Sequence, residues 1–218
     1  MKVHNFSESN SLLNAFVREI RDITIQNDRL RFRRNIERVG EIMAYEISKD
    51  FDYENIIVDT PLDKSEVSVP NEDVVIATIL RAGLPFHHGM LNYLDGADNA
   101  FVSAYRKYKE TGHHTFDIHV EYIASPSIEG KTLILTDPML ATGASMELTY
   151  RALLTKGNPA KIHIATIIAS RQAVDYCIEN FPENTTIWAG AIDPGINDSS
   201  YIVPGLGDAG DLSYGEKL

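Results

Sequence analysis

The sequence predicts an α/β fold in which a central, mostly parallel β-sheet is flanked by helices. From Pro70 onward, short apolar runs rich in β-branched residues alternate with stretches of helical periodicity. This alternation is typical of parallel strands joined by crossover helices. The chain has 218 residues, of which 44% are hydrophobic, and no linker rich in Pro, Gly or Ser divides it. We therefore expect a single domain over residues 1–218.

The expected elements fall into three parts. N-terminal helices are expected within residues 10–50, where apolar residues such as Phe32, Ile36 and Val39 recur at helical spacing and arginines fill much of the opposite face. We interpret the arginines at 31–34 as a solvated, salt-bridged face. The sheet core spans about residues 70–192. Its strands are predicted at 74–80, 99–105, 132–136, 161–169 and 185–192, and its helices at 85–94, 145–155 and 172–180.

Two segments depart from this alternation. Residues 105–123 have a polar middle followed by alternating apolar residues, a pattern that predicts a β-hairpin arm. Such an arm is marginal unless it is covered, so it is a candidate dimer element. The tail from 193 to 218 is rich in Gly and Pro but also carries Tyr201, Ile202 and Leu206. The apolar residues favour an ordered loop structure over disorder.

The net charge of −11 argues against general binding to nucleic acid or to an anionic membrane. No apolar run is long enough to span a bilayer, and the first eleven residues lack the apolar core of a signal peptide. Cys177 is the single cysteine, so the chain has no internal disulfide and fits a cytoplasmic location. We interpret Cys177 as a core residue and expect no metal site at His87 and His88.

The segment from Asp137 to Ser145 is the first candidate site. A strand, a small-residue turn and a helix start leave backbone N–H groups available to an anion. Gly143 permits close approach, Thr142 and Ser145 add hydroxyl groups, and Asp137 can accept hydrogen bonds from sugar hydroxyls or support Mg²⁺. From the residues alone, an ordinary turn with a Ser or Thr cap is as plausible. Neither a P-loop nor a dinucleotide-binding G-x-G-x-x-G is present.

The same segment resembles the loop of the type I phosphoribosyltransferase family that binds phosphoribosyl pyrophosphate (PRPP), and its Asp-Pro start resembles the uracil branch of that family. The resemblance implies the type I phosphoribosyltransferase fold with a small C-terminal hood for the base. It also implies that the loop binds PRPP through Asp137, Pro138, Met139, Leu140, Ala141, Thr142, Gly143, Ala144 and Ser145.

Two arginines extend the resemblance. Ile79 to Gly83 is similar to the family's pyrophosphate loop, in which Arg81 offers a fork of donors to a diphosphate. Arg106 stands where the family has another arginine that contacts the diphosphate. Both residues are therefore expected to bind PRPP, and Arg81 is also expected to act in catalysis.

The tail carries the most specific resemblance. Residues 192–197 and 201–211 look like the family's uracil-binding segment, so 192–211 is the predicted base-binding segment. The resemblance implies that the backbones of Ile202, Gly207 and Ala209 read the carbonyl and N–H edge of uracil. It places Asp208 near the base and the PRPP ribose. Asp137, Asp208 and Arg81 are the expected catalytic residues.

The resemblance thus implies conversion of uracil and PRPP to UMP and diphosphate, with Mg²⁺ held mainly through PRPP and no direct protein ligand assigned. It also implies a homodimer or a higher homo-oligomer. The alternatives are a phosphoribosyltransferase for another nucleobase, a non-catalytic PRPP-binding regulator that binds RNA, or a purely structural homologue. Three departures from the family pattern stand out: Ala144 in place of a second glycine, Asp198-Ser199-Ser200 before Tyr201, and Pro85 to His88 in place of a more apolar stretch.

Overall fold

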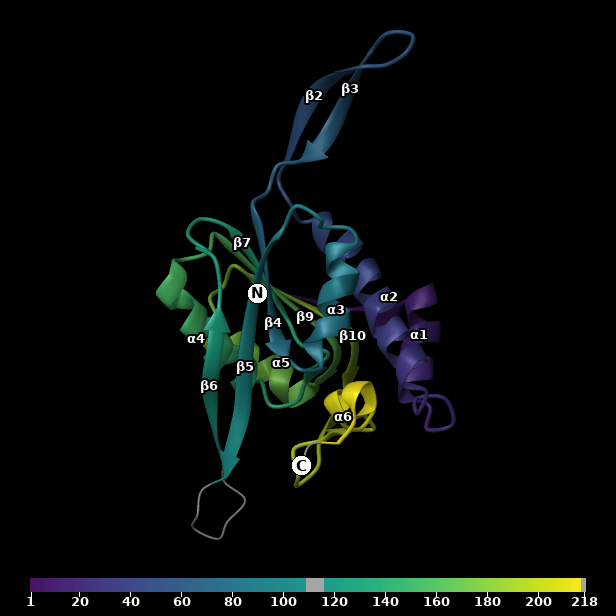
Figure 1. Cartoon of the computed structure of the whole chain (residues 1–218), viewed down its shortest axis with the longest axis vertical. Coiled ribbons are helices and arrows are strands. Elements are labelled where there is room, and N and C mark those ends of the chain that lie inside the picture. The colour runs from purple at the N-terminus through teal and green to yellow at the C-terminus, as the bar shows by residue number, and fades with distance from the viewer. Residues whose placement is uncertain (109–115, 217–218) are drawn as a thin grey trace.

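The computed structural model describes residues 1–108 and 116–216, and the side chains of residues 104–120 lie outside that description. Its main sheet has the spatial order β1-β10-β9-β7-β4-β5-β6, with β8 attached to β9 (Figure 1). Only the β5–β6 pair is antiparallel among the described strands of this sheet, so the predicted mostly parallel sheet is confirmed. The strands are β1 Lys2–Asn5, β4 Val74–Leu80, β5 Asp98–Tyr108, β6 Phe116–Ala124, β7 Thr132–Thr136, β8 Met139–Leu140, β9 Lys161–Ser170 and β10 Thr185–Asp193.

Helices cover both faces of this sheet (Figure 1). One face packs against α1 (Leu12–Arg21), α2 (Arg29–Ser48) and α3 (Gly83–Leu91), and the other against α4 (Ala144–Leu153) and α5 (Arg171–Asn180). Each face carries its own hydrophobic core: the first core lies under α1, α2 and α3, and the second under α4 and α5. Neighbouring strand residues point to opposite faces, so Ile134 packs in the first core while Leu133 and Leu135 pack in the second. Within the described residues, no helix combines the length and the apolar composition needed to cross a membrane.

Short elements complete the chain. Two are 3₁₀ turns, η1 (Phe6–Glu8) and η2 (Leu154–Lys156). The tail is ordered, as predicted: it forms a two-residue ladder between β11 (Gly195–Ile196) and β12 (Ile202–Val203) and ends in helix α6 (Ala209–Tyr214). The predicted hairpin arm is the β5–β6 pair, whose connection at residues 109–115 lies outside the described part of the chain.

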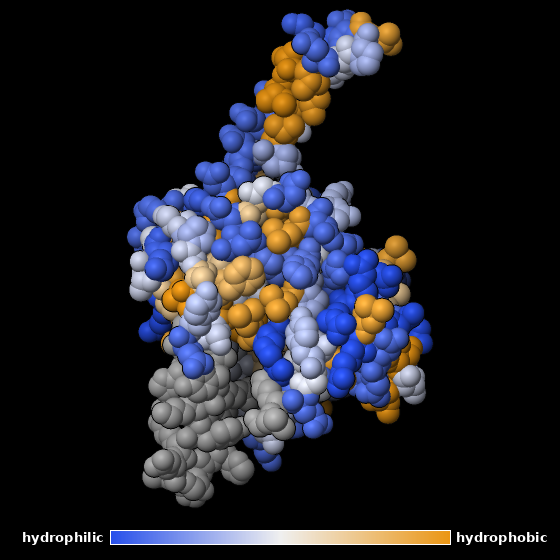
Figure 2. Space-filling model, viewed as in Figure 1, coloured by the Kyte–Doolittle hydropathy of each residue, from blue (hydrophilic) through white to orange (hydrophobic). Residues whose placement is uncertain are grey.

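Apart from the two-residue strands β8, β11 and β12, three strands were not predicted from the sequence. The edge strand β1 pairs in parallel with β10, and the strands β2 (Tyr53–Asp59) and β3 (Lys64–Pro70) form a hairpin that projects away from the body (Figure 1). Hydrophobic side chains gather along this hairpin (Figure 2), among them the exposed Tyr53, Ile57 and Leu62. These strands contribute little to the two cores, which is why hydrophobic periodicity did not reveal them.

Two of the arginines at 31–34 are ion-paired, as predicted, whereas Arg33 donates to the backbone carbonyl of Ser213 at 2.7 Å. Arg31 pairs with Glu19 at 2.6 Å and Arg34 pairs with Glu37 at 2.6 Å. The interpretation of Cys177 as a core residue is also confirmed, because its side chain is fully buried. Burial raises the pKa of the Cys177 thiol to about 12, so the thiolate needed for nucleophilic chemistry is not formed at neutral pH.

A buried His163–Trp188 pair lies under the first core. The indole Nε1 of Trp188 donates a hydrogen bond to Nδ1 of His163 at 3.0 Å, and both side chains are almost completely buried. His4 from β1 stacks on the indole at a centroid distance of 4.1 Å. Since Nδ1 accepts a hydrogen bond, His163 must be neutral, and burial lowers its pKa from 6.5 to about 4.

This pair predicts acid-sensitive stability. In the unfolded chain His163 takes up its proton near pH 6.5, whereas in the folded chain it does so only near pH 4. Acidification therefore favours the unfolded state within that window. We expect His163 to remove about 2 kcal/mol of unfolding free energy between about pH 8 and pH 5, measured by urea denaturation. His163→Gln keeps an acceptor for the indole without titrating, so its pH slope should be flatter. Equal slopes in both proteins would contradict the assignment.

Candidate active site

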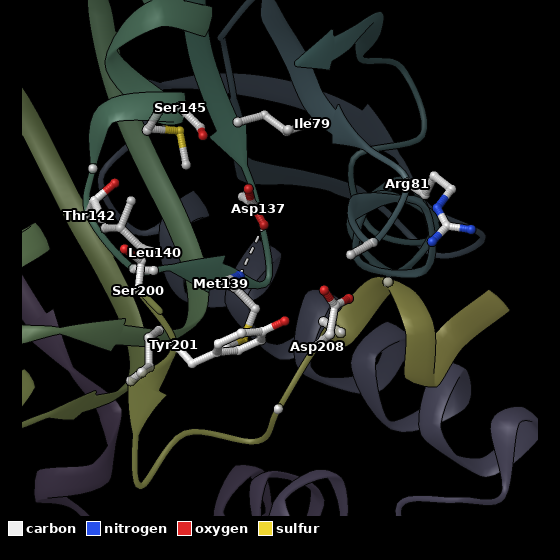
Figure 3. A pocket seen from close by; sticks show the side chains of 18 of the residues that line it. Ile79, Arg81, Asp137, Met139, Leu140, Thr142, Ser145, Ser200, Tyr201 and Asp208 are labelled. Carbon is white, nitrogen blue, oxygen red and sulfur yellow. Dashed lines mark hydrogen bonds between the residues drawn. The ribbon is translucent and has the colours of Figure 1, made fainter. Parts of the chain in front are cut away.

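A cavity of about 460 Å³ opens at the carboxyl ends of the parallel strands (Figure 3). This is the edge where ligands bind in open α/β sheets, because the loops diverge there. Three segments enclose it: the turn after β4, the loop after β7 and the C-terminal tail. Predicted site residues that line the cavity are Arg81, Asp137, Met139, Leu140, Ala141, Thr142, Gly143, Ser145, Ile202, Gly207, Asp208 and Ala209.

The loop after β7 has the geometry of an anion site. Its first part is fixed by β8, which pairs with β9. Gly143 then adopts φ 82° as the N-cap residue of α4 and has no side chain to cap the helix. The hydroxyl of Thr142 accepts the N–H of Ala144 at 3.4 Å, so a threonine beside the N-cap takes one N–H of the first turn. The hydroxyl groups of Thr142 and Ser145 stand at the cavity wall (Figure 3), beside the start of α4.

Asp137 stands at the end of β7 with its carboxyl group toward the cavity (Figure 3). Its Oδ1 accepts a hydrogen bond from the backbone N–H of Met139 at 3.0 Å. That bond holds the side chain over the turn, so that the carboxylate lies between the loop after β7 and the tail. Pro138 and Ala144 do not line the cavity in the described structure. Pro138 instead accepts hydrogen bonds from Ile167 and Ile168 on β9.

Arg81 reaches the cavity from the turn after β4. Its Nη2 lies 3.1 Å from a carboxylate oxygen of Asp211 and 3.4 Å from the carbonyl of Gly215, both in the tail. Its Nε is buried, and no described residue accepts a hydrogen bond from it. The Arg81 side chain is 38% exposed at the cavity, so its guanidinium can also bind an anion there.

A buried hydrogen-bond chain lies beneath the turn that carries Arg81 and the loop that carries Asp137. The hydroxyl of Thr78 on β4 is 2.6 Å from Nδ1 of His87 and 2.7 Å from the hydroxyl of Thr136 on β7. Burial lowers the pKa of His87, which keeps this ring neutral at physiological pH. The sequence departure at His87 thus serves the interior of the chain.

The tail forms the wall opposite the loop after β7. Ile202 and Ala209 are buried, whereas Gly207 is exposed and adopts φ 93°. Asp208 caps α6 by accepting the N–H of Asp211 at 2.9 Å, and its carboxyl group points into the cavity (Figure 3). The backbone groups expected to read a base edge and the carboxylate expected beside them therefore lie together.

Three tail residues line this cavity but were not among the predicted site residues: Ser200, Tyr201 and Gly210. The ring of Tyr201 extends along the cavity between Met139 and Asp208 (Figure 3). Ser200 lines the mouth with φ 61°, and it is the single non-glycine residue with positive φ in the described chain. Ser200 belongs to the departure at 198–200, and strain at this position is the structural consequence of a side chain there. Its hydroxyl gave no motif signal.

The structure places the side chain of Ala144 but does not describe that of Arg106. Ala144 begins α4 with ordinary negative φ, so its methyl group is accommodated as expected. Arg106 pairs through its backbone with Ile118 in the β5–β6 hairpin, but its side chain lies outside the described residues. Its contact with diphosphate stays a prediction.

The side chains around the cavity suit Mg²⁺ only when substrate phosphates supply further oxygen ligands. Among the described residues, no group of three or more His, Cys, Asp or Glu side chains converges on one point. Two carboxylates, Asp137 and Asp208, do face the same cavity. Mg²⁺ usually keeps several waters and is bound through one or two carboxylates together with substrate phosphates. The residues present fit that mode of binding.

Comparisons with known proteins point to one family. The family model described as uracil phosphoribosyltransferase matches residues 7–215. A curated protein named uracil phosphoribosyltransferase from Porphyromonas gingivalis is 69% identical over 218 residues, covering 100% of both chains. One of the same name from Pyrococcus furiosus is 35% identical over 219 residues, covering 99% of this chain and 91% of the relative.

Solved structures agree at the level of fold. A structure of an Aquifex aeolicus protein superimposes with a TM-score of 0.85 at 31% identity and covers 98% of both chains. A hypoxanthine phosphoribosyltransferase from Staphylococcus aureus has a TM-score of 0.50 at 13% identity, with 86% of this chain and 83% of that chain covered. The chain therefore shares its fold with a phosphoribosyltransferase, as the resemblance of the loop implied.

Proposed function

This chain belongs to the uracil phosphoribosyltransferase family, and we propose that its 460 Å³ cavity is where uracil reacts with PRPP. The enzyme is a pentosyltransferase that forms UMP and diphosphate. One observation carries the assignment of the site: the phosphate loop, Arg81 and the predicted uracil segment, which lie far apart in sequence, line one cavity.

The phosphoribosyl end is held by the loop after β7. Backbone N–H groups at the start of α4, with Thr142 and Ser145, receive the 5-phosphate, because a helix N-terminus offers both donors and a favourable dipole. Arg81 and Arg106 bind the diphosphate. The carboxylate of Asp137 accepts hydrogen bonds from the ribose hydroxyls. The geometry that supports this arrangement is the position of Asp137 between the phosphate loop and Arg81 (Figure 3).

The chemical step is a displacement at the anomeric carbon of the ribose. The bond from uracil N1 to that carbon forms as the bond to the diphosphate oxygen breaks, and its electron pair leaves with diphosphate. Positive charge develops on the ribose, so fixed carboxylates and aligned reactants lower the barrier. Asp208, or a water molecule that it orients, accepts the proton from N1.

Mg²⁺ completes the proposal. When it is bound, it offsets the negative charge of the diphosphate leaving group. The ion would be held mainly through PRPP, and Asp137 is the carboxylate that would support it from the cavity wall. The two carboxylates at the cavity support this mode.

Base selectivity resides in the tail. Uracil presents carbonyl, N–H and carbonyl groups along one edge, and the backbones of Ile202, Gly207 and Ala209 pair with them. Cytosine places an amino donor where one carbonyl should be, so a donor would face a donor. An unpaired buried donor costs about 1–3 kcal/mol, enough to disfavour cytosine.

We also propose a cytoplasmic homo-oligomer. The fully buried, single Cys177 fits a reducing compartment. Exposed apolar residues along the β2–β3 hairpin, such as Ile57 and Leu62, are of the kind that subunit interfaces bury.

A base panel tests the function. Purified protein with PRPP and Mg²⁺ is offered each nucleobase separately, and the nucleotide product is measured. We expect UMP from uracil and no product from the other bases. A different preferred base would overturn the assignment of the tail, whereas PRPP binding without turnover on any base would favour the regulator alternative.

A further inference from the structure

The N-terminal helices touch the uracil segment through two side chains that no sequence motif marks. Arg21 ends α1, and Gln26 lies in the connection between α1 and α2. Both reach residues 193–206, more than 170 positions along the chain. We propose that Gln26 and Arg21 are positioning residues that set the orientation of the backbone groups that read uracil. This inference rests on the proposed function, since it concerns the same base-binding segment.

Arg21 holds one end of the segment. Its guanidinium forms two 2.8 Å hydrogen bonds with the carboxylate of Asp193 and donates to the carbonyl of Gly205 at 2.9 Å. Asp193 in turn accepts the N–H of Gly205 at 2.8 Å. Both polar backbone groups of Gly205 are therefore fixed by side chains. A Cβ at Gly205 would lie 2.1 Å from the carbonyl oxygen of Ile202, so the turn is also too tight for any other residue.

Gln26 holds the next peptide. Its Nε2 donates to the carbonyl of Ile20 at 2.9 Å and to the carbonyl of Leu206 at 3.0 Å, and the side chain is buried. Both partners are acceptors, so the amide orientation is determined by its surroundings. The two N–H bonds of one side-chain amide thus tie the tail to the end of α1.

The position of Gln26 fixes the direction of the Gly207 N–H. The peptide between Leu206 and Gly207 is trans, so its C=O and N–H point in opposite directions. Gln26 binds the C=O from the side of a second cavity of about 410 Å³. Gly207 lines both cavities, so an N–H that points away from Gln26 would face the 460 Å³ cavity. Gln26 therefore presents a donor to a uracil carbonyl without touching uracil.

Steady-state kinetics of Gln26→Glu tests this role. The substitution keeps the shape but removes the donor and sets a carboxylate against two carbonyl oxygens. We expect KM for uracil to rise about tenfold or more while KM for PRPP changes by less than about twofold, because the phosphate loop is untouched. The preference for uracil over cytosine, as a ratio of kcat/KM values, should fall as well.

Two further variants make the test specific. Asn27→Asp is the matched control, because Asn27 also donates its side-chain amide to a backbone carbonyl, that of Ile23, but is exposed. It should behave as wild type. Gln26→Met removes the donor without adding charge and should shift KM for uracil in the same direction by less. Unchanged KM for uracil, or equal rises in both KM values, would overturn the positioning role. Wild-type UMP formation in the same assay keeps that result separate from a failure of the proposed function.

Discussion

Asp137→Asn is expected to reduce kcat/KM for PRPP by roughly 100- to 1000-fold, the range for removing one well-placed electrostatic group. The substitution should leave the loop intact, because the side-chain oxygen of asparagine can still accept the Met139 N–H that Asp137 now binds at 3.0 Å. What disappears is the negative charge that faces the cavity. The ribose hydroxyls then lose a charged acceptor, and the developing positive charge loses a fixed anion.

Asp198→Asn is the control for that experiment. Asp198 is an exposed carboxylate in the tail, so the same change of charge there should leave kcat/KM near the wild-type value. Thermal denaturation of both variants checks that the fold is retained. Turnover at the wild-type rate by Asp137→Asn would remove Asp137 from the proposed mechanism.

The sheet, its helices and the phosphate loop were predictable because their signals are local. Buried strands such as Thr132–Thr136 are continuous apolar runs, and the loop that follows depends on small residues in direct succession. The same holds for the tail, where glycines permit the backbone conformations that a close approach requires. The resemblance to a family added the substrates, which no periodicity can supply.

The positions that sequence reasoning missed are those held by distant partners. Gln26 and Arg21 have no motif of their own, and their contacts in the tail are separated from them by 180 and 172 residues. The strand β1 is four residues long and gains its place only by pairing with β10. The β2–β3 hairpin is mostly exposed, so hydrophobic periodicity does not mark it.

Substitution of Gly143 is expected to have the second large effect on PRPP binding, because backbone conformation and packing both exclude a side chain at this position. At φ 82°, an L-residue costs roughly 1–2 kcal/mol more than glycine. A Cβ would also lie 2.6 Å from Cδ1 of Tyr176, a ring that is anchored by a hydrogen bond to Glu147. Gly143→Ala must therefore shift either the phosphate loop or α5.

We expect Gly143→Ala to raise KM for PRPP by about tenfold or more, because the N–H groups at the start of α4 lose their common direction toward the 5-phosphate. Gly130→Ala separates the effect of backbone strain from that of the steric clash. Gly130 has φ 70°, but an added Cβ would have nothing within 4 Å, so alanine there is strained without meeting a neighbouring atom. The Gly130→Ala variant should lose stability but keep the wild-type KM for PRPP. Adding Tyr176→Ala to Gly143→Ala removes the collision and should recover part of the affinity for PRPP. If Gly143→Ala bound PRPP as wild type does, the phosphate would have to lie elsewhere, since an altered turn cannot present the same donors.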